Sequence, residues 1–358
     1  MRPLVIPQIK KPTMMYGLGV LSHLIGYERE LSEKNIMSDM KDKELQKLLE
    51  ENSLLSGLAI ESEILNSAKF TELTLTNEEK NISLEEGESA IITLNGRSSL
   101  NIAIATKNSN DNKKAAAIIM RVKDNSDVEL KIIYENRKGN ESDETKPQIS
   151  VEQESISMLK MLIGENSKVT LNELFITNSN SFRRTNITLK GNGSKIYPNH
   201  AYFTYGNAKV DFKSEVTHYG ENSESDMKVK GIINESSSVI TQGHVTIKPS
   251  AFNSNGYQQE DLILVGEKSI ARPIPNLEIG NNEVKCSHGA TVSNIDEETL
   301  FYLQSRGIRK HDAISLLLSS FLSPIMGLFT GEEKEKYQHD LKIIIEESGE
   351  IGALAQEK

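Results

Sequence analysis

The sequence contains one cysteine and no tryptophan, and both scarcities narrow the classes of protein it can belong to. Cys286 alone cannot form an intramolecular disulfide, so the chain is not a disulfide-stabilised secreted domain, and a solitary thiol suits a reducing compartment. Aromatic residues account for only 5% of the chain, so it offers few flat surfaces on which bases can stack. We therefore expect neither a base-stacking nor a sugar-stacking surface.

Positive charge is also in deficit, because 41 lysine and arginine residues face 51 aspartate and glutamate residues, for a net charge of -10. A chain with this balance repels phosphate backbones at long range. Neighbouring basic residues occur only as pairs such as Arg183 and Arg184. We therefore expect no nucleic-acid partner.

Long hydrophobic runs are missing as well. Residues 12–27 and 314–329 carry no Asp, Glu, Lys or Arg, but each is shorter than the roughly 20 residues that a membrane-spanning helix needs, and Pro324 interrupts the second. The apolar residues 4–6 near the start are too few for the core of a signal peptide. We expect a soluble, cytoplasmic protein without a membrane role.

The motifs of nucleotide and hydrolase sites are absent too. The chain has no Gly-x-x-x-x-Gly-Lys-Ser/Thr phosphate loop and no Gly-x-Ser-x-Gly nucleophile elbow. Gly191-Asn192-Gly193 lacks the strand and helix that flank a dinucleotide site. We expect a protein that binds no nucleotide and has no catalytic residues, so that any ATP hydrolysis belongs to a partner.

Three regions differ in their hydrophobic pattern. Residues 1–66 carry leucines at three- and four-residue spacings, as in Leu45, Leu48 and Leu49, which predicts an N-terminal helical domain. Residues 67–292 carry short runs rich in β-branched residues, separated by polar turns, which predicts strands. Residues 293–358 return to a helical pattern and are expected to form a C-terminal helical domain.

A turn signature recurs through the strand region: an Asn, Asp, Gly or other polar residue, small or polar residues, and then an apolar residue that opens a strand. The apolar positions are 100, 128, 169, 196, 210, 239 and 270. Their spacings are multiples of about 14 residues, and two such units would make one coil of a flattened parallel β-helix. An antiparallel β-sandwich is the alternative, because its strands recur at similar intervals.

The C-terminal region shows specific helix signals. Asp296 is expected to cap a helix whose first turn contains Glu297 and Glu298, and Gly307 is placed to end it. A second helix is expected to bury one face, and residues 334–347 to form a third. The apolar residues of that face are Ile314, Leu317, Leu318, Phe321, Leu322 and Ile325.

Cys286 and His288 are the strongest candidates for metal chemistry. On a strand, residues two apart point to the same face, which they would share with Val284, Ala290 and Val292. A thiolate and an imidazole there could both approach one metal centre, but an iron–sulfur site usually takes four ligands. The alternative is a buried cysteine beside a hydrogen-bonded histidine.

Four other acidic or histidine residues lie on expected strands without the spacing of a metal site. They are His218, His244, Glu215 and Asp226.

The segment from Val284 to Val292, with sequence VKCSHGATV, resembles the SufB/SufD family of iron–sulfur cluster assembly scaffolds. The similarity continues through residues 295–308, IDEETLFYLQSRGI, and Asp312-Ala313 follows at the family spacing. Upstream, residues 257–259, 262–264 and 275–279 also look like the family. The strong similarity covers roughly residues 200–325.

The resemblance implies a right-handed parallel β-helix flanked by N- and C-terminal helical domains. It implies a SufC-type ABC ATPase partner that docks on the C-terminal helical region, where Arg306, Gly307, Ile308 and Asp312 join two helices. It further implies pairing with a SufB-type scaffold through the β-helices, a nascent iron–sulfur cluster or iron near that junction, and His288 as a ligand. Cys286 matches a neighbouring family cysteine.

Two departures place the chain on the SufD side of the family. Glu260 stands where SufB-type members carry a sulfur-accepting cysteine, and Gly289 stands where they carry a glutamate. The chain could not accept sulfur at position 260, although Glu260 could supply an oxygen ligand. A combined SufB/SufD scaffold that forms a homodimer with the ATPase stays open, and a β-helix enzyme acting on polysaccharide is a distant alternative.

Overall fold

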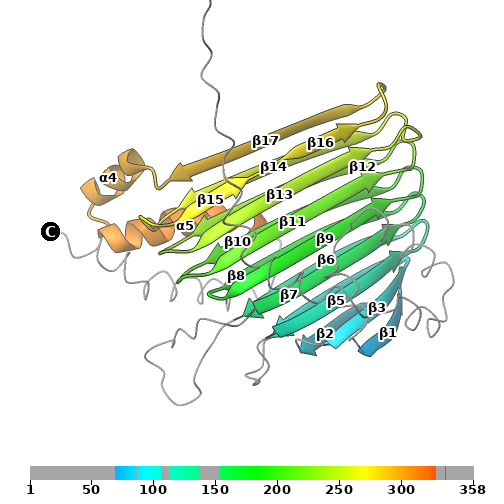
Figure 1. Cartoon of the computed structure of the whole chain (residues 1–358), viewed down its shortest axis with the longest axis horizontal. Helices are drawn as coiled ribbons and strands as arrows, with labels where there is room; N and C mark the ends of the chain where they lie inside the picture. The colour runs from blue at the N-terminus through cyan, green and yellow to red at the C-terminus, as the bar shows by residue number, and fades with distance from the viewer. Residues whose placement is uncertain (1–68, 86–87, 106–112, 137–153, 328–334, 336–358) are drawn as a thin grey trace, which may run out of the picture. The chain divides into compact units, whose positions relative to one another are not determined.

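The computed structural model describes residues 69–85, 88–105, 113–136, 154–327 and 335, and in these the chain winds into a parallel β-solenoid (Figure 1). The strands alternate between two sheets, one of nine and one of eight strands, and every strand pair is parallel. Up to the last coil, each strand pairs in parallel with the next but one along the chain. This pairing excludes an antiparallel β-sandwich and confirms the predicted flattened solenoid.

One sheet, called sheet A, contains the odd-numbered strands from β1 to β15 together with β16. The other, sheet B, contains the even-numbered strands from β2 to β14 together with β17. The elements are β1 (Lys69–Thr76), β2 (Glu79–Glu85), β3 (Glu88–Asn95), β4 (Arg97–Ala105), β5 (Lys113–Val122), β6 (Asp127–Asn136), β7 (Glu154–Ile163), β8 (Lys168–Thr177), β9 (Asn180–Leu189), β10 (Lys195–Thr204), β11 (Lys209–His218), β12 (Glu224–Ile233), β13 (Ser238–Ile247), β14 (Asn255–Leu264), β15 (Ile270–Pro273), β16 (Asn276–Ile279), β17 (Lys285–Asn294), α4 (Glu297–Ser305) and α5 (Lys310–Met326).

The register shows the predicted period. Lys195 of β10 pairs with Lys168 of β8 and with Glu224 of β12, so one coil takes 27 residues in the first case and 29 in the second. Each coil therefore holds two units of about 14 residues, one for each sheet. The period read from the sequence is confirmed.

The turns explain why the signature contains asparagine or glycine followed by a small residue. Asn125, Asn166 and Gly193 have φ angles of 57°, 52° and 66°, a left-handed conformation that asparagine and glycine tolerate best. The following serines stack from coil to coil: the backbone N–H of Ser126 donates to the hydroxyl of Ser167 at 3.1 Å. A larger side chain would push the stacked turns apart.

Alternate residues of both sheets fill the interior. In the coils from β3 to β7 this interior is apolar and fully buried, with Ile92, Leu100, Leu130 and Ile163 each 0% exposed. Burial of this kind contributes roughly 1.5–3 kcal/mol per large side chain. The solenoid is therefore held together by stacked rows of branched side chains.

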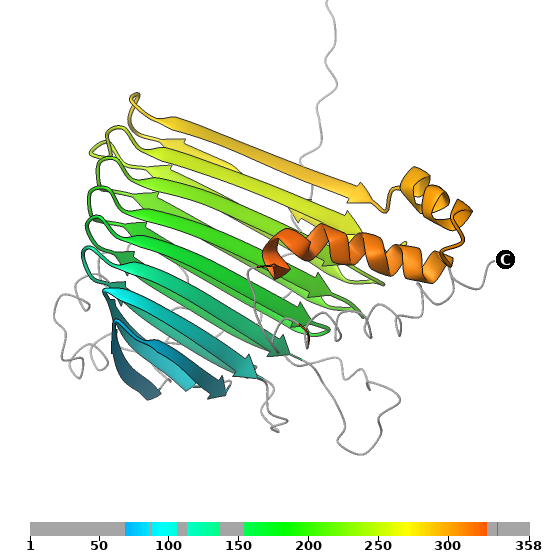
Figure 2. The same cartoon turned by 180° about the vertical axis from the view of Figure 1, so that it is seen from behind.

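Helix α5 lies across the outer face of sheet B (Figure 2). Its Ile314, Leu318, Leu322 and Ile325 are buried against outward-facing residues of the sheet such as Phe203, which confirms the predicted apolar face. Pro324, expected to interrupt this segment, is accommodated, and the helix continues to Met326. Its place near the end of the helix leaves few backbone hydrogen bonds for the ring to disrupt.

Helix α4 has the predicted ends. The Asp296 side chain accepts a hydrogen bond from the backbone N–H of Thr299. At the other end Gly307 has φ 86° and its N–H donates to Gln304, while the N–H of Ile308 donates to the carbonyl of Leu303. This pair of bonds is a Schellman motif, which favours glycine at the left-handed position.

The boundaries 1–66, 67–292 and 293–358 stay predictions. Strands begin at Lys69 and end at Asn294 within the described residues, whereas the expected N-terminal helices and nearly all of residues 334–347 lie outside them. No described helix is both long enough and apolar enough to cross a membrane.

Candidate functional site

The last coil of the solenoid, formed by β15, β16 and β17, is open on one side within the described part of the chain. Among the described strands, β17 pairs only with β14, and β15 and β16 pair only with β13. Most of their side chains are exposed, including the apolar Ile270, Ile279 and Val292 at 47%, 49% and 41%. The predicted ligands Cys286 and His288 lie on this end strand.

Cys286 faces the interior of the solenoid and is half-buried. It pairs in register with Gly256, contacts the small apolar cluster of Val245, Ile247 and Ala251, and is a free thiol. Burial raises the pKa of the Cys286 thiol, and the backbone of Gly256 only partly offsets this. The thiol is therefore neutral near pH 7 and would lose its proton on binding a metal.

His288 is exposed and follows Cys286 by two residues, so strand alternation places both side chains on the same face, as predicted. It pairs in register with Gln258 of β14, which is buried in the interior. The imidazole thus stands at the mouth of the solenoid.

Glu260 lies one coil further in and is fully buried, in register with Ala290 of β17. Its Oε2 accepts a hydrogen bond from the hydroxyl of Thr241, while its Oε1 has no hydrogen-bond partner. Burial raises the pKa of the Glu260 carboxyl, although Thr241 and the backbone of Gly243 lower it in part.

These three predicted ligands do not close a metal site by themselves. In the region that the structure describes, no group of three or more His, Cys, Asp or Glu side chains is arranged to hold a metal ion. The last coil therefore presents separate donors along one wall, and a complete ligand set needs further groups.

The four weaker candidates are dispersed. His218 is buried between the hydroxyls of Ser223 and Ser225, each 2.8 Å from a ring nitrogen. His244, Glu215 and Asp226 lie on the outer faces, where Glu215 and Asp226 pair with lysines and His244 lies 3.8 Å from Glu278.

The predicted partner-binding residues form the connection between α4 and α5. Arg306 and Gly307 are exposed, and Ile308 is half-buried. Asp312 accepts a hydrogen bond from Arg309 Nε at 2.7 Å in the first turn of α5. Each has a local structural role, and the exposed Phe301 and Tyr302 of α4 add apolar surface beside them.

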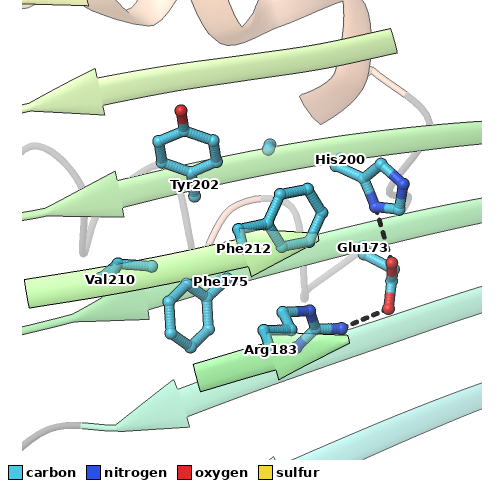
Figure 3. Close-up of a pocket in the computed structure, with 8 residues that line it drawn as sticks. Glu173, Phe175, Arg183, His200, Tyr202, Val210 and Phe212 are labelled. Atoms are coloured by element: carbon cyan, nitrogen blue, oxygen red, sulfur yellow. Dashed lines mark hydrogen bonds and ion pairs between the residues drawn. The ribbon is translucent and has the colours of Figure 1, made fainter. Parts of the chain in front are cut away.

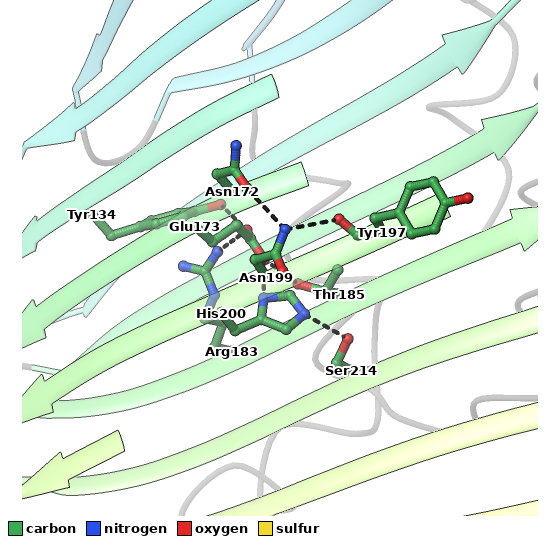
Figure 4. Close-up of polar contacts among 9 residues, drawn as sticks. All are labelled: Tyr134, Asn172, Glu173, Arg183, Thr185, Tyr197, Asn199, His200 and Ser214. Atoms are coloured by element: carbon green, nitrogen blue, oxygen red, sulfur yellow. Dashed lines mark hydrogen bonds and ion pairs between the residues drawn. The ribbon is translucent and has the colours of Figure 1, made fainter. Parts of the chain in front are cut away.

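A buried polar cluster in the middle of the solenoid was not predicted from the sequence. We call it the inner cluster, and its members are Tyr134, Glu173, Arg183, Thr185, His200 and Ser214 (Figures 3 and 4). Glu173 is its centre: Arg183 donates to Oε1, and His200 Nδ1 lies 2.6 Å from Oε2. The guanidinium carbon of Arg183 lies 3.3 Å from the centre of the Tyr134 ring.

The charges of the inner cluster support one another. Burial pushes the pKa of the Glu173 carboxyl up, but Arg183 and His200 outweigh it and the pKa falls to about 2. Burial raises the pKa of Tyr134 well above its usual range. Glu173 therefore stays ionised at any pH at which the protein is used, with Arg183 as its buried counter-ion.

Glu173, His200 and Ser214 have the connectivity of a hydrolase triad, since His200 Nε2 lies 3.1 Å from the Ser214 hydroxyl. Substrate cannot reach them, because their side chains are 0–2% exposed. The cavity beside them is about 10 Å³, room for a single water molecule. We therefore interpret these three residues as part of a packed polar core and not as a catalytic site for hydrolysis.

Comparison with known proteins gives the family. The model for "SUF system FeS cluster assembly, SufBD core domain" matches residues 71–321. An iron–sulfur cluster assembly SufBD family protein of Porphyra purpurea is 30% identical over 162 residues, 45% of this chain and 33% of that protein. SufD of Escherichia coli strain K12 is 27% identical over 165 residues, 46% of this chain and 39% of that protein.

SufD of Bacillus subtilis strain 168 is 31% identical over 133 residues, 34% of this chain and 30% of that protein. The chain thus matches only about a third of the length of these three curated relatives. The family model, in contrast, covers more than half of the chain, from the first strand of the solenoid into helix α5. The predicted resemblance is confirmed, and the chain belongs to the SufB/SufD family of iron–sulfur cluster assembly proteins.

Proposed function

We propose that the chain is a SufD-like, non-enzymatic scaffold subunit. It works with a SufC-type ATPase and a SufB-type partner, and it offers donors to iron or a nascent iron–sulfur cluster at the open end of its solenoid. The observation that carries the proposal is the position of His288 and Cys286. They occupy one face of β17, the last strand of the solenoid in the part of the chain that the structure describes.

The open end has the properties of a pairing surface. An edge strand with unsatisfied backbone groups invites another strand, and β17 has no partner on its outer side within the described residues. Exposed Ile270, Ile279 and Val292 add apolar area that pairing would bury. A second scaffold placed there would bring its own donors to His288 and Cys286.

The incomplete ligand set fits a shared site. Iron–sulfur clusters usually take four protein ligands, and the described residues offer no closed set. A transient site of this kind can release its cluster to a recipient protein more readily than a fully ligated one. The cluster is cargo here, and no nucleotide is bound by this chain.

Residues 260 and 289 support the SufD assignment over the SufB one. Glu260 is buried and its carboxylate cannot carry a persulfide, so sulfur acceptance falls to the partner. Position 289 faces outward, because a Cβ on Gly289 would lie 2.3 Å from Oε1 of Gln259. A glutamate at 289 would therefore point away from the interior that holds Cys286.

The connection between α4 and α5 is the proposed docking site of the ATPase. Arg306, Ile308 and Asp312 lie there beside Phe301 and Tyr302, which are 73% and 55% exposed. Apolar side chains exposed to this degree, next to charged ones, are common at interfaces between proteins.

The test is anaerobic cluster assembly by the purified complex, followed by visible absorbance. We expect His288→Ala to reduce assembly at least about tenfold, the scale of losing a metal-site interaction. Ser287→Ala is the matched control, because Ser287 is the adjacent residue on the other face of β17. If both variants assemble clusters at the unaltered rate, the metal role is wrong.

Subunit stoichiometry separates the two scaffold arrangements. Co-purification with one SufB-type chain and the ATPase supports the SufD-like subunit. A complex of two copies of this chain with the ATPase, active without a SufB-type chain, would instead identify a combined homodimeric scaffold.

A further inference from the structure

The turns that lead from sheet A to sheet B form one long edge of the solenoid, at the ends of the strands farthest from α4 (Figure 1). Backbone hydrogen bonds between neighbouring turns align their residues, coil by coil, into two columns. The first column reads Lys123, Gly164, Lys190, Tyr219, Lys248 and Gly280, and the second reads Asp124, Glu165, Asn192, Glu221, Phe252 and Glu283. Each column thus contains a single aromatic residue among charged residues, asparagine or glycine.

Tyr219 and Phe252 lie on neighbouring coils and are 38% and 45% exposed. The Ser250 hydroxyl, two residues before Phe252, donates to the carbonyl of Tyr219 at 2.9 Å, which holds the two turns together. A repeating solenoid provides an internal control for each position. Because the other coils place lysine, glutamate or glycine here, the turn itself does not require an aromatic side chain. Aromatic residues are enriched in protein interfaces, from which lysine and glutamate are depleted.

Exposed apolar side chains of the solenoid are confined to its last coils. Among the side chains that the structure describes, the large apolar ones that are exposed on the solenoid are Tyr219, Phe252, Tyr257, Ile270, Ile274, Ile279 and Val292. All of them lie at or after Tyr219, towards the open end. The turn with Phe252 leads into β14, the strand that pairs with β17. The two exposed rings therefore continue the apolar surface of the open end around the edge of the solenoid.

The end face is too small to hold a partner by itself. Strand β17 has ten residues, so it is about 33 Å long, and with sheets about 10 Å apart the end face measures about 330 Å². Even doubled to allow for the relief of side chains, this area falls short of the roughly 800 Å² that each partner buries in a stable complex. A scaffold that pairs with the open end must also contact surfaces beside it.

We propose that Tyr219 and Phe252 form a docking surface, the corner patch, for the scaffold partner that meets the open end. The inference rests on the proposed function, which supplies a SufB-type chain as that partner. Flanking charges define the matching surface: lysines precede and follow Tyr219 in its column, and glutamates do so for Phe252. A fitting partner segment therefore presents apolar side chains between an acidic and a basic residue, and these charges fix its orientation.

The first test replaces both rings by the residue types of the neighbouring coils, in the double variant Tyr219→Lys with Phe252→Glu. Both substitutions are native to these columns, so the solenoid should fold unchanged. We expect the dissociation constant for the SufB-type chain, measured with the full chain by biolayer interferometry, to rise at least about tenfold, the scale of losing a central aromatic contact. Lys123→Ala with Glu165→Ala, in the same columns three coils earlier, is the matched control and should bind like the unaltered chain.

The second test identifies what covers the patch. The photoreactive residue p-benzoylphenylalanine is placed at Phe252, and at Glu165 as the control. In the assembled complex we expect position 252 to cross-link to the SufB-type chain and position 165 to give no such product. The inference is overturned by a double variant that binds as tightly as the control. It is also overturned if position 252 gives no cross-link in the complex, or cross-links only to the ATPase or to a second copy of this chain.

The failure of this inference differs from the failure of the proposed function. If the unaltered chain does not bind a SufB-type chain at all, the proposed function is wrong and the corner patch falls with it. If the unaltered chain binds, and His288→Ala impairs cluster assembly while the double variant of the corner patch binds normally, only the corner patch is wrong.

Discussion

Replacing Glu173 by glutamine should destabilise the protein strongly, because it leaves the guanidinium group of Arg183 buried without its counter-ion. Both side chains are 2% exposed, and the ion pair lies in the middle of the stacked coils. Removing one partner of such a pair costs about 3–5 kcal/mol. That is a large part of the roughly 5–15 kcal/mol by which folded domains are stable.

The double variant Glu173→Leu with Arg183→Met distinguishes two free energies. One is the destabilisation caused by a buried, unpaired charge, and the other is the net contribution of the ion pair to stability. Apolar replacements of similar size remove both desolvated charges, and such exchanges are often neutral or stabilising by about 1–4 kcal/mol. We therefore expect the double variant to be more stable than Glu173→Gln. Urea unfolding followed by far-ultraviolet circular dichroism measures both, since the chain lacks the tryptophan that fluorescence would need.

The pH dependence gives an independent check with a defined sign. The pKa of Glu173 falls from 4.5 to about 2 on folding, since Arg183 and His200 outweigh the effect of burial. Because the folded-state pKa is the lower one, the pair stabilises the protein above pH 4.5. This contribution, about 3 kcal/mol, is lost as the pH falls towards 2. Glu173→Gln should lack this part of the acid loss.

The reasoning about the inner cluster is refuted by either of two results. One is a cost below about 1 kcal/mol for Glu173→Gln, which would fit an exposed ion pair. The other is a double variant as unstable as the single one, which would mean that packing volume and not the orphaned charge sets the cost.

Two further predictions concern other parts of the fold. Burial lowers the pKa of His218 from 6.5 to about 4. The free energy of unfolding should therefore be highest above pH 6.5 and fall by up to about 3 kcal/mol as the pH drops to 4. Urea unfolding midpoints should fall between pH 7 and pH 5 in Glu173→Gln, which keeps His218, but not in His218→Asn. Ile308→Lys combined with Asp312→Lys should abolish co-purification with the SufC-type ATPase, whereas Val292→Ser at the open end should not, and retention of the ATPase by the first variant would count against the docking site.

Much of the fold could be read from the sequence because the solenoid repeats its turn chemistry. A left-handed asparagine or glycine followed by a stacked serine has to recur once per coil, as at Asn125, Asn166 and Gly193. The helix ends at Asp296 and Gly307 were predictable for the same reason, since a cap has a short local pattern. Local chemistry of this kind does not depend on distant partners.

The inner cluster was missed although a signal existed. Glu173 falls in the same alternation as Val169, Leu171 and Phe175, which all point inward. His200 follows it by 27 residues, one coil, and pairs with it in register. A charged residue in the inward phase of one strand therefore had a matching partner in the next. Recognising this pair required knowing which residues of neighbouring coils lie side by side. A period of about 14 residues with loops of irregular length does not fix that register.

Predicting the site residues from the sequence depended even more on knowing which coil lies at the end of the solenoid. Strand parity placed Cys286 and His288 on one face, but only the absence of a following coil in the described residues makes that inward face accessible. The surroundings of the Glu260 carboxyl come from the facing sheet, because Thr241 and Gly243, which lie against it, belong to β13. Sequence distance carries no information on such contacts between sheets.

The polar residues of the interior are graded along the solenoid, and this gradient connects its stability with its function. Coils up to β7 have apolar centres, the next coils hold Glu173 and His200, and the last two hold Glu260 and His288. In a stack where each coil is stabilised mainly by its neighbours, the apolar coils can supply the stability that the polar end gives up. The coil that carries the proposed metal ligands is then a terminal one, since β17 pairs with a single strand among the described residues. A partner that pairs with β17 would both complete the ligand set and supply the missing neighbour, so assembly of the complex and formation of the site would be one event.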